Sequence, residues 1–382
     1  MSKKIISLVA VLVVLLILVV AGLLFIGYQT HHQKGQSEQS SSYSSSESSS
    51  QSSSESSSHP SSESSSSGTA SSSSEDGATS SSTYPLYFSV MIHLEEDWND
   101  DTNSALFQRH EEVLQYAMQL FDEYGAKLTI ESEEPFAKAV IAADSSLLND
   151  ALADGHGVGT HCGKDVDGNT IDELAAAYKE RKDLVDSIVG AENNRGCSGG
   201  WGTTDYVLAA TEAGFGYLDG VVYLAYLSMP VSKRPNHLSN QDIQHIYYHD
   251  PAIPDFSDHI YPRFLADAQD FVEDPEGELV LLNGELGEIS SLYEGRQSCG
   301  ISCVFTSADT QVILDNITTA AAIRDPSRVA HLYVHIPLNT FTTENEALLR
   351  AWLENMQQLQ NQGTVVWATQ KEVYEAKLSE RE

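Results

Sequence analysis

A serine tract limits how much of this 382-residue chain can fold. Residues 35–83 are almost entirely serine with scattered Glu and Gln, as in SSSYSSSESSSQSSSESSS. Such a segment contains too little apolar surface to offset the conformational entropy that is lost when a chain is ordered. We therefore predict a disordered linker over residues 29–83 and one large folded domain over residues 84–382.

An uncharged apolar stretch, IISLVAVLVVLLILVVAGLLFIGY, occupies residues 5–28. It is long enough to cross a hydrocarbon core of roughly 30 Å as a helix. A cleaved signal peptide is the alternative, but its apolar region normally runs about 7 to 15 residues before a small-residue cleavage site. Because Lys3 and Lys4 precede the stretch, residues 1–4 are predicted to stay in the cytoplasm and the rest to lie outside the cell. The expected location is the cell membrane, with a single transmembrane anchor.

The net charge of the chain limits the classes of partner that it can bind. The formal net charge is −34, from 21 Lys and Arg against 55 Asp and Glu. Nucleic acids and anionic lipid surfaces are bound through clustered Lys and Arg, so we predict no nucleic-acid partner. Neutral or cationic sugars and peptides remain open as ligands.

From residue 84 onward, short β-rich runs alternate with longer amphipathic ones. This alternation is typical of parallel strands joined by crossover helices. We predict an α/β fold, a distorted (β/α) barrel of seven to eight mostly parallel strands. The strands are expected near Leu86, Lys127, Gly157, Asn193, Tyr217, Glu278, Val329 and Thr364.

Three helices are predicted between these strands. The segment 104–125 carries one apolar face, made of Leu106, Leu114, Ala117, Leu120, Phe121 and Tyr124. The segment 169–190 begins with Thr170 and Glu173 at the spacing of a capping box, and the segment 344–363 ends at a glycine. Residues 225–274 show no clear period and are predicted to form a long excursion at the barrel rim.

Polar and titratable residues recur where the predicted strands end. They are Glu95, Glu96, Asp97, His161, Arg195, Cys197, Asn283, Glu285 and His335. In a βα barrel the carboxyl ends of the strands carry the chemistry, so these side chains are expected to share one rim. Each of these residues could also have a purely structural role. Glu95 could be a solvated strand end, Arg195 a surface ion pair and His335 a core histidine.

A metal site is the sharpest hypothesis for this rim. His161 and Asp165 are four residues apart, which permits joint ligation, and a carboxylate from the first strand could supply a third ligand. Three ligands drawn from His and carboxylate, with one open position, are typical of a catalytic zinc or a similar divalent ion that activates water.

The order of motifs resembles the polysaccharide deacetylase (NodB-like) family. SVMIHLEEDW resembles its opening strand with paired acids, and GHGVGTHCGKD resembles its Gly-His-x-(Ile/Val)-Gly-x-His motif. NNRGCSGGWG offers the arginine of the third motif without its prolines, and HLYVHIPLNTF resembles the strand with the late histidine. The resemblance covers most of residues 86–375.

The resemblance implies a role for each candidate. Its catalytic set is Glu95 as base, Arg195 orienting that base and His335 as general acid. Its metal ligands are Glu96 (less well Asp97), His161 and Asp165, where Asp165 replaces the second histidine of the family. His156 would be structural. The implied reaction is removal of an acetyl group from a glycan, such as a cell-wall polysaccharide, by a metal-activated water.

Two departures keep other functions open. The Asp165 replacement and the missing prolines favour a catalytically silent domain of the same fold that binds a glycan or a partner. A third hypothesis is a glycosidase that uses Glu95 and Glu285, which would have to face each other about 5 to 10 Å apart.

Four cysteines complete the pattern: Cys162, Cys197, Cys299 and Cys303. Outside the cell, disulfides are favoured over free thiols, and four cysteines allow three pairings. Because the ends of the third and fourth strands adjoin in a barrel, we favour Cys162–Cys197. Cys299 and Cys303 would then close a small loop, with a zinc-binding pair there as the alternative.

Overall fold

A computed structural model describes residues 83–94, 99–163, 170–199, 204–220, 231–234, 237–240, 242–243, 259–269, 271–295, 299 and 302–381. The predicted cytoplasmic residues 1–4, the anchor at 5–28 and all of the linker but its last residue lie outside these ranges. Within the described ranges, no helix combines the length and the apolar character that a membrane crossing needs.

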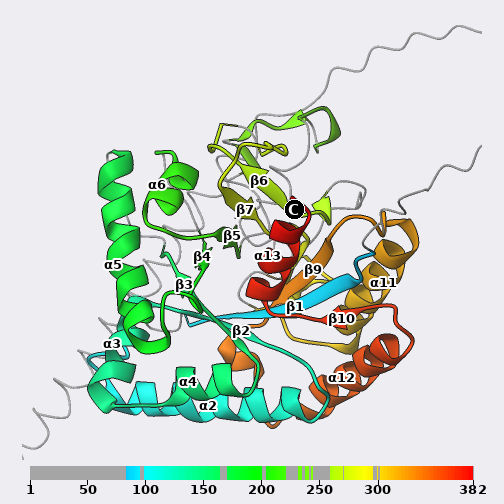
Figure 1. Ribbon diagram of the computed structural model, residues 1–382. Helices are drawn as coiled ribbons and strands as arrows, with labels where there is room; N and C mark the ends of the chain where they lie inside the picture. The colour runs from blue at the N-terminus through cyan, green and yellow to red at the C-terminus, as the bar shows by residue number, and fades with distance from the viewer. Residues whose placement is uncertain are drawn as a thin grey trace, which may run out of the picture. The chain divides into compact units, whose positions relative to one another are not determined.

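The core of the domain is one ten-stranded sheet (Figure 1). Its strands follow the order β6 (Arg263–Leu265), β7 (Leu279–Leu281), β5 (Tyr217–Asp219), β4 (Gly196–Ser198), β3 (Gly157–His161), β2 (Thr129–Ser132), β1 (Leu86–His93), β9 (Ala330–His335) and β8 (Glu285–Glu288). The short β10 (Val366–Trp367) pairs with β1. All pairings are parallel except that of β6 with β7.

The predicted barrel needs a correction. Each of the eight expected strands is present, but the sheet has ten strands and is an open half-barrel. Strands β6 and β8 form its two edges, and no pairing joins them among the described residues. Both edge strands escaped prediction. Strand β6 lies in the segment 225–274, whose sequence shows no clear period, and β8 contains an irregular register.

Helices connect the strands, and all but the last cover the outer face of the sheet. They are α2 (Ser104–Asp122), α3 (Glu134–Ala143), α4 (Leu147–Ala153), α5 (Ile171–Val189), α6 (Tyr206–Glu212), α11 (Ser307–Ile323), α12 (Glu346–Asn361) and α13 (Gln370–Ser379). The three predicted helices are confirmed as α2, α5 and α12. Thr170 caps α5 as expected, because its hydroxyl accepts a hydrogen bond from the Glu173 amide at 3.2 Å.

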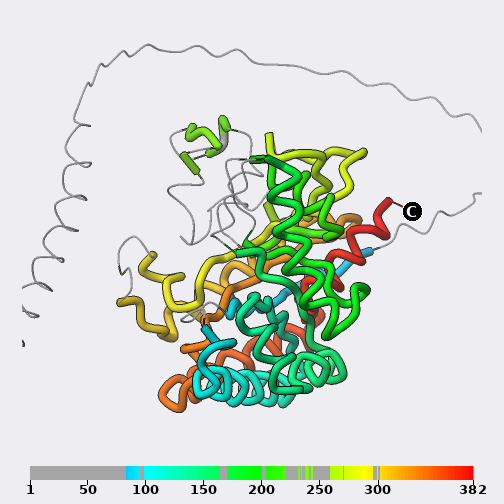
Figure 2. The backbone as a smooth tube through the Cα atoms, turned by 90° about the vertical axis from the view of Figure 1, so that its left-hand side faces the viewer, coloured from blue at the N-terminus to red at the C-terminus, as the bar shows by residue number. Residues whose placement is uncertain are grey.

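The outer face of the sheet is apolar because strand residues alternate between its two sides. On β1, the outward-facing Phe88 packs edge-on against Trp367 and Trp352, with ring centroids 5.3 and 6.4 Å apart. Leu114, Leu120 and Phe121 of α2 join this core as predicted. In both views α2, α4 and α12 lie below the strands (Figures 1 and 2).

Helix α13 packs against one end of the inner face. Its residues Val373 and Tyr374 cluster with Tyr217 of β5 and Phe264 of β6. Two capping interactions fix its start, since the Thr369 hydroxyl accepts from the Glu372 amide and the Glu372 carboxylate accepts from the Thr369 amide.

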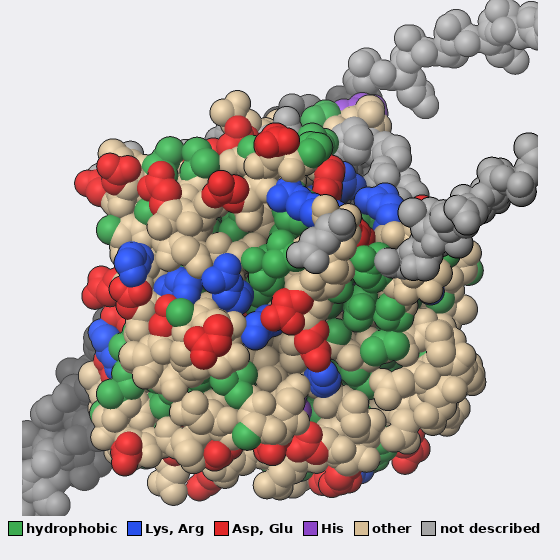
Figure 3. All heavy atoms as spheres, viewed as in Figure 1, with side chains coloured by type: hydrophobic (Ala, Val, Ile, Leu, Met, Phe, Trp, Pro, Cys, Tyr) green, Lys and Arg blue, Asp and Glu red, His purple; other side chains and the backbone are tan. Residues whose placement is uncertain are grey.

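On the face in Figure 3, which is the view of Figure 1, acidic and basic side chains are interspersed.

A glycine is required where the chain enters β8. Gly284 has φ +97°, and a Cβ placed there would overlap the backbone carbonyl oxygen of His331 on β9. We expect Gly284→Ala to lower the free energy of unfolding by several kcal/mol, measured by denaturant titration, because neither backbone can yield without breaking the β8–β9 pairing.

Gly363 provides the matched control for this prediction. It also has a positive φ, +72°, but no atom lies within 4 Å of its would-be Cβ. Gly363→Ala should therefore cost only about 1 kcal/mol, the cost of the left-handed backbone alone. Equal losses in the two variants would show that the contact with β9 is unimportant.

Candidate functional site

Three histidines meet on the inner face of the sheet, at the carboxyl ends of their strands. His93 ends β1, His161 ends β3 and His335 ends β9. The His93 ring lies between the other two, with centroid distances of 4.6 Å to His161 and 4.6 Å to His335. All three side chains are buried. The structure thus brings the predicted His161 and His335 together around a histidine that the sequence analysis did not single out.

Ser198 lies against this group from the neighbouring strand. It ends β4, in register with His161 of β3 and Asp219 of β5. Its hydroxyl oxygen is 2.5 Å from His93 Nε2 and 3.6 Å from Met91 Sδ. A side chain at position 220 would overlap the Ser198 hydroxyl, so Gly220, with φ +96°, leaves the space that the Ser198–His93 pair occupies.

Three buried carboxyl groups lie on the same inner face. Burial raises the pKa of Asp219 to about 7, against an opposing effect of the Ser198 hydroxyl. Burial and the nearby Asp219 raise the pKa of Glu285 to about 8, with the Tyr333 hydroxyl acting in the opposite sense. Burial, and then Asp219, raise the pKa of Glu131 well above its usual range. Such values suit groups that exchange protons near neutral pH.

Glu131 is accommodated by a glycine on the next strand. A Cβ at Gly159 of β3 would overlap its carboxylate. Among the described residues, neither Glu131 oxygen nor the Tyr217 hydroxyl has a hydrogen-bond partner. Buried polar groups without partners are costly, and such exceptions cluster at functional sites.

Arg195 is not brought to this group. It precedes β4, whereas Ser198 occupies the carboxyl end of that strand. Its guanidinium lies over the ring of Tyr374 on α13, 6.0 Å from the centroid, and one of its nitrogens is 3.5 Å from the Tyr374 hydroxyl. The motif match selected Arg195, which lies three residues before the end of β4. Arg195 is therefore at the opposite end of β4 from the three histidines.

The other predicted residues lie outside the described ranges or away from the three histidines, apart from Glu285. Glu95, Glu96 and Asp165, with the less favoured Asp97, lie outside the described residues. His156 directly precedes β3, at the opposite end of that strand from His161. Its Nδ1 accepts a hydrogen bond from the Leu128 amide at 3.2 Å, in keeping with a structural role. Glu285 is on the inner face, but its separation from Glu95, on which the glycosidase hypothesis depends, is not defined.

The described residues contain imidazole and carboxylate donors but not a complete metal site. No group of three His, Cys, Asp or Glu side chains within them is arranged to hold an ion. His161 is nevertheless in the setting of a ligand, since its Nδ1 lies 3.7 Å from Glu133 Oε1 and both side chains are buried. A site built on His161 would need further donors from outside the described residues, and the carboxylates of the predicted ligands Glu96 and Asp165 are of a kind that fits zinc.

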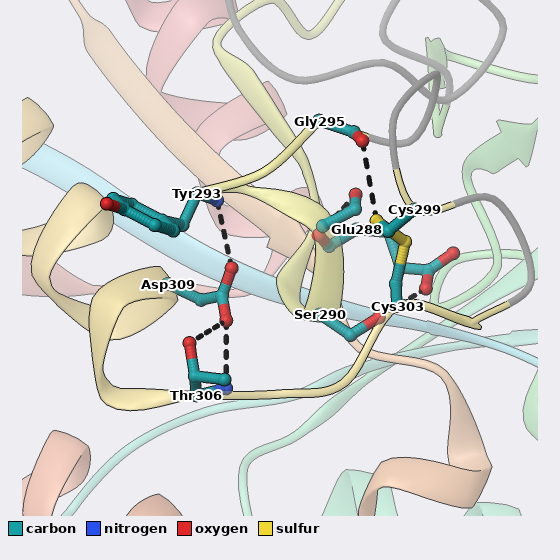
Figure 4. The surroundings of a disulfide bond; sticks show 9 residues. Glu288, Ser290, Tyr293, Gly295, Cys299, Cys303, Thr306 and Asp309 are labelled. Atoms are coloured by element: carbon teal, nitrogen blue, oxygen red, sulfur yellow. Dashed lines mark hydrogen bonds between the residues drawn. A yellow bond between two sulfur atoms is a disulfide. The ribbon is translucent and has the colours of Figure 1, made fainter.

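Both predicted disulfides are present, which rules out a zinc pair at Cys299 and Cys303. Cys162–Cys197 joins the ends of β3 and β4 on the outer face, next to His161 and Ser198, with the Cα atoms 5.5 Å apart. Cys299–Cys303 closes a small loop before α11 (Figure 4). There Asp309 accepts hydrogen bonds from the Tyr293 amide at 2.9 Å and the Thr306 amide at 2.8 Å.

Comparison by sequence finds no family model that matches the chain and no similar curated protein. Comparison by structure is informative. A protein from Mycobacterium smegmatis assigned as a polysaccharide deacetylase is 12% identical, with a TM-score of 0.51 over 78% of this chain and 91% of that one. PuuE allantoinase is 11% identical, with a TM-score of 0.51 over 77% of this chain and 90% of that one. The chain has a divergent NodB-like fold.

The NodB-like fold is thereby confirmed, and at these identities the likeness extends to the fold alone. A 4-α-glucanotransferase from Thermococcus litoralis is also similar, at 13% identity and a TM-score of 0.46, but the chain spans only 40% of its length. That likeness carries no argument about activity.

Sequence reasoning missed several inner-face residues of the NodB-like sheet: His93, Glu131, Ser198 and Asp219. His93, Ser198 and Asp219 end their strands, as His161 and His335 do, but no motif drew attention to them. The available signal was the alternation of β1, in which Ser89 and His93 interrupt an otherwise apolar run.

Proposed function

We propose that this protein is a hydrolase that removes acetyl groups from a glycan outside the cell, held to the cell membrane by residues 5–28. The observation that carries the proposal is the meeting of His161 and His335 at the carboxyl ends of parallel strands in a NodB-like sheet. In open α/β sheets this edge is where ligands bind.

We assign the following roles to residues of the chain. His335, buried beside His93, would protonate the departing amine or alkoxide. Glu95 would accept the proton of the attacking water. The raised pKa values of Asp219 and Glu285 support a site in which protons move near neutral pH. Arg195 has no part in the proposed site, because its guanidinium lies beside Tyr374.

A divalent metal ion, most simply zinc, belongs to the proposal. His161 would hold it together with the carboxylates of Glu96 and Asp165. When bound, such an ion lowers the pKa of a coordinated water and polarises a carbonyl group. The buried Glu133 would orient the His161 ring from the side of Nδ1.

The test is the metal content of the purified full-length protein, together with acetate release from a panel of acetylated glycans. We expect about one ion per chain in the unaltered protein, and we expect His161→Ala to lose both the ion and acetate release, by on the order of 100-fold or more. Removal of the ion by a chelator should have the same effect, and added zinc should restore activity.

His156→Ala serves as the control, because this histidine lies at the other end of β3 and supports the backbone of Leu128. It should keep its metal even if it unfolds at a lower temperature. A protein that contains no metal and releases no acetate, yet binds a glycan, would overturn the proposal in favour of the silent binding domain.

A further inference from the structure

Ser198 and His93 have the contact of a nucleophile and its base. Ser198 Oγ and His93 Nε2 are 2.5 Å apart, which is direct hydrogen-bonding contact between a hydroxyl group and an imidazole. Both side chains are buried, so the contact is sheltered from competing water. Neither residue belongs to the metal ligands or the acid and base proposed above.

The local chain around Ser198 resembles the turn that presents a nucleophilic serine. The sequence Gly196-Cys197-Ser198-Gly199-Gly200 has the Gly-x-Ser-x-Gly spacing, and Ser198 is the last residue of a parallel strand. Gly199 turns the chain with φ +71°. At Gly196 a Cβ would overlap the ring of Tyr217, so the glycines make room for neighbouring strands.

A second imidazole ring lies beside the pair. His161 is in ring contact with His93, and its Nε2 lies 3.0 Å from the position of a Cβ at Gly199, directly after the serine.

We infer that Ser198 is a nucleophile for acyl transfer, with His93 as its base, and that the site can cleave small acyl esters through an acyl-serine intermediate without a metal ion. Ser198 Oγ attacks the acyl carbonyl carbon while its proton passes to His93 Nε2. The bond from that carbon to the leaving oxygen breaks, and His93 returns the proton to the leaving group. Water then attacks the acyl-Ser198 ester, again through His93, releasing the carboxylic acid and restoring the serine hydroxyl.

A second serine–histidine pair provides a matched control within the same sheet. Ser89 Oγ is 3.0 Å from His331 Nε2, and both side chains are buried on the inner face. Ser89 lies in the middle of β1 instead of at a strand end, and burial lowers the pKa of His331 to about 3. This pair has the same chemical groups without the placement or the basicity of a catalytic pair.

The experiment uses p-nitrophenyl acetate as the probe, with the full-length protein and a chelator present throughout. We expect a rapid release of about one p-nitrophenolate per chain, and peptide mass spectrometry should locate one acetyl group on Ser198. Ser198→Ala should abolish both signals, and His93→Ala should slow acylation by on the order of 100-fold or more. Ser89→Ala should leave acylation unchanged.

Ser198→Cys guards against a variant that fails to fold, because a thiol at this position would keep the nucleophile and form a longer-lived acyl adduct. Acylation in Ser198→Ala equal to that of the unaltered protein, or an acetyl group on another residue only, would overturn the inference. The outcome is independent of the metal-dependent proposal, because the ion has been removed and the glycan is not used.

Discussion

The double variant Asp219→Asn, Glu285→Gln is expected to gain stability relative to the unaltered protein as the pH rises from 5 to 8. In the folded protein the two carboxyl groups have pKa values of about 7 and about 8, against ordinary values of 3.8 and 4.5. The folded state therefore holds protons that the unfolded chain has already released between about pH 4 and pH 8.

The sign of the effect follows from this difference. Because the folded state binds more protons than the unfolded state in this window, the free energy of unfolding falls as pH rises through it. A rise in pKa of this size corresponds to on the order of 4 kcal/mol for one group, and the nearness of the two groups makes their effects non-additive. The amides do not titrate, so the variant should lose much of this pH dependence.

Denaturant titrations at pH 5 and pH 8 measure the effect, and the difference between the two pH values cancels any change in packing. Asp101→Asn, at an exposed position after β1, is the control and should follow the unaltered protein. The same pH dependence in the double variant and the unaltered protein would show that Asp219 and Glu285 are ionised in the folded state at low cost.

The second large effect is expected from the disulfide between β3 and β4. Cys162 and Cys197 are 35 residues apart and fully buried, whereas Cys299 and Cys303 are four residues apart. In the chain-entropy model, cross-links of these spans stabilise the fold by about 4 and about 2 kcal/mol. Cys162→Ala with Cys197→Ala should therefore lower the melting temperature more than Cys299→Ala with Cys303→Ala.

The β3–β4 disulfide should also matter for the site. It follows His161 directly and precedes Ser198 directly, so it holds the two strand ends that carry these side chains in register. Its removal should reduce acylation of Ser198, whereas removal of the Cys299–Cys303 link should not. Equal thermal losses for the two double variants, with acylation intact in both, would contradict this prediction.

Much of the fold was predictable because it depends on patterns that are local in the chain. The apolar face of α2, the cap at Thr170 and the eight predicted strand signals each occupy fewer than about 25 consecutive residues, and such periods reflect burial on one side. The same reasoning failed for β6 and β8. Neither shows a period in its own sequence, and pairing with another strand is what makes each of them a strand.

The site was predictable only in part, for a related reason. His161 and His335 were found because each follows or ends a recognisable strand, and both lie in the histidine group. Arg195 was expected at the carboxyl end of β4 but lies before the strand begins, because a motif match does not define where a strand ends. His93 and Ser198 were missed because their pairing joins residues 105 positions apart, and no local pattern records such a contact.

The sequence by itself determined the alternation of strands and helices, the extent of the serine tract and the identity of each polar residue, because these depend on neighbours along the chain. The tertiary structure alone decided which of those residues meet. Its curled parallel sheet directs alternate side chains of β1, β3, β4, β5 and β9 into one buried space, and there burial and close contact raise the pKa values of the carboxyl groups and bring Ser198 within hydrogen-bonding distance of His93.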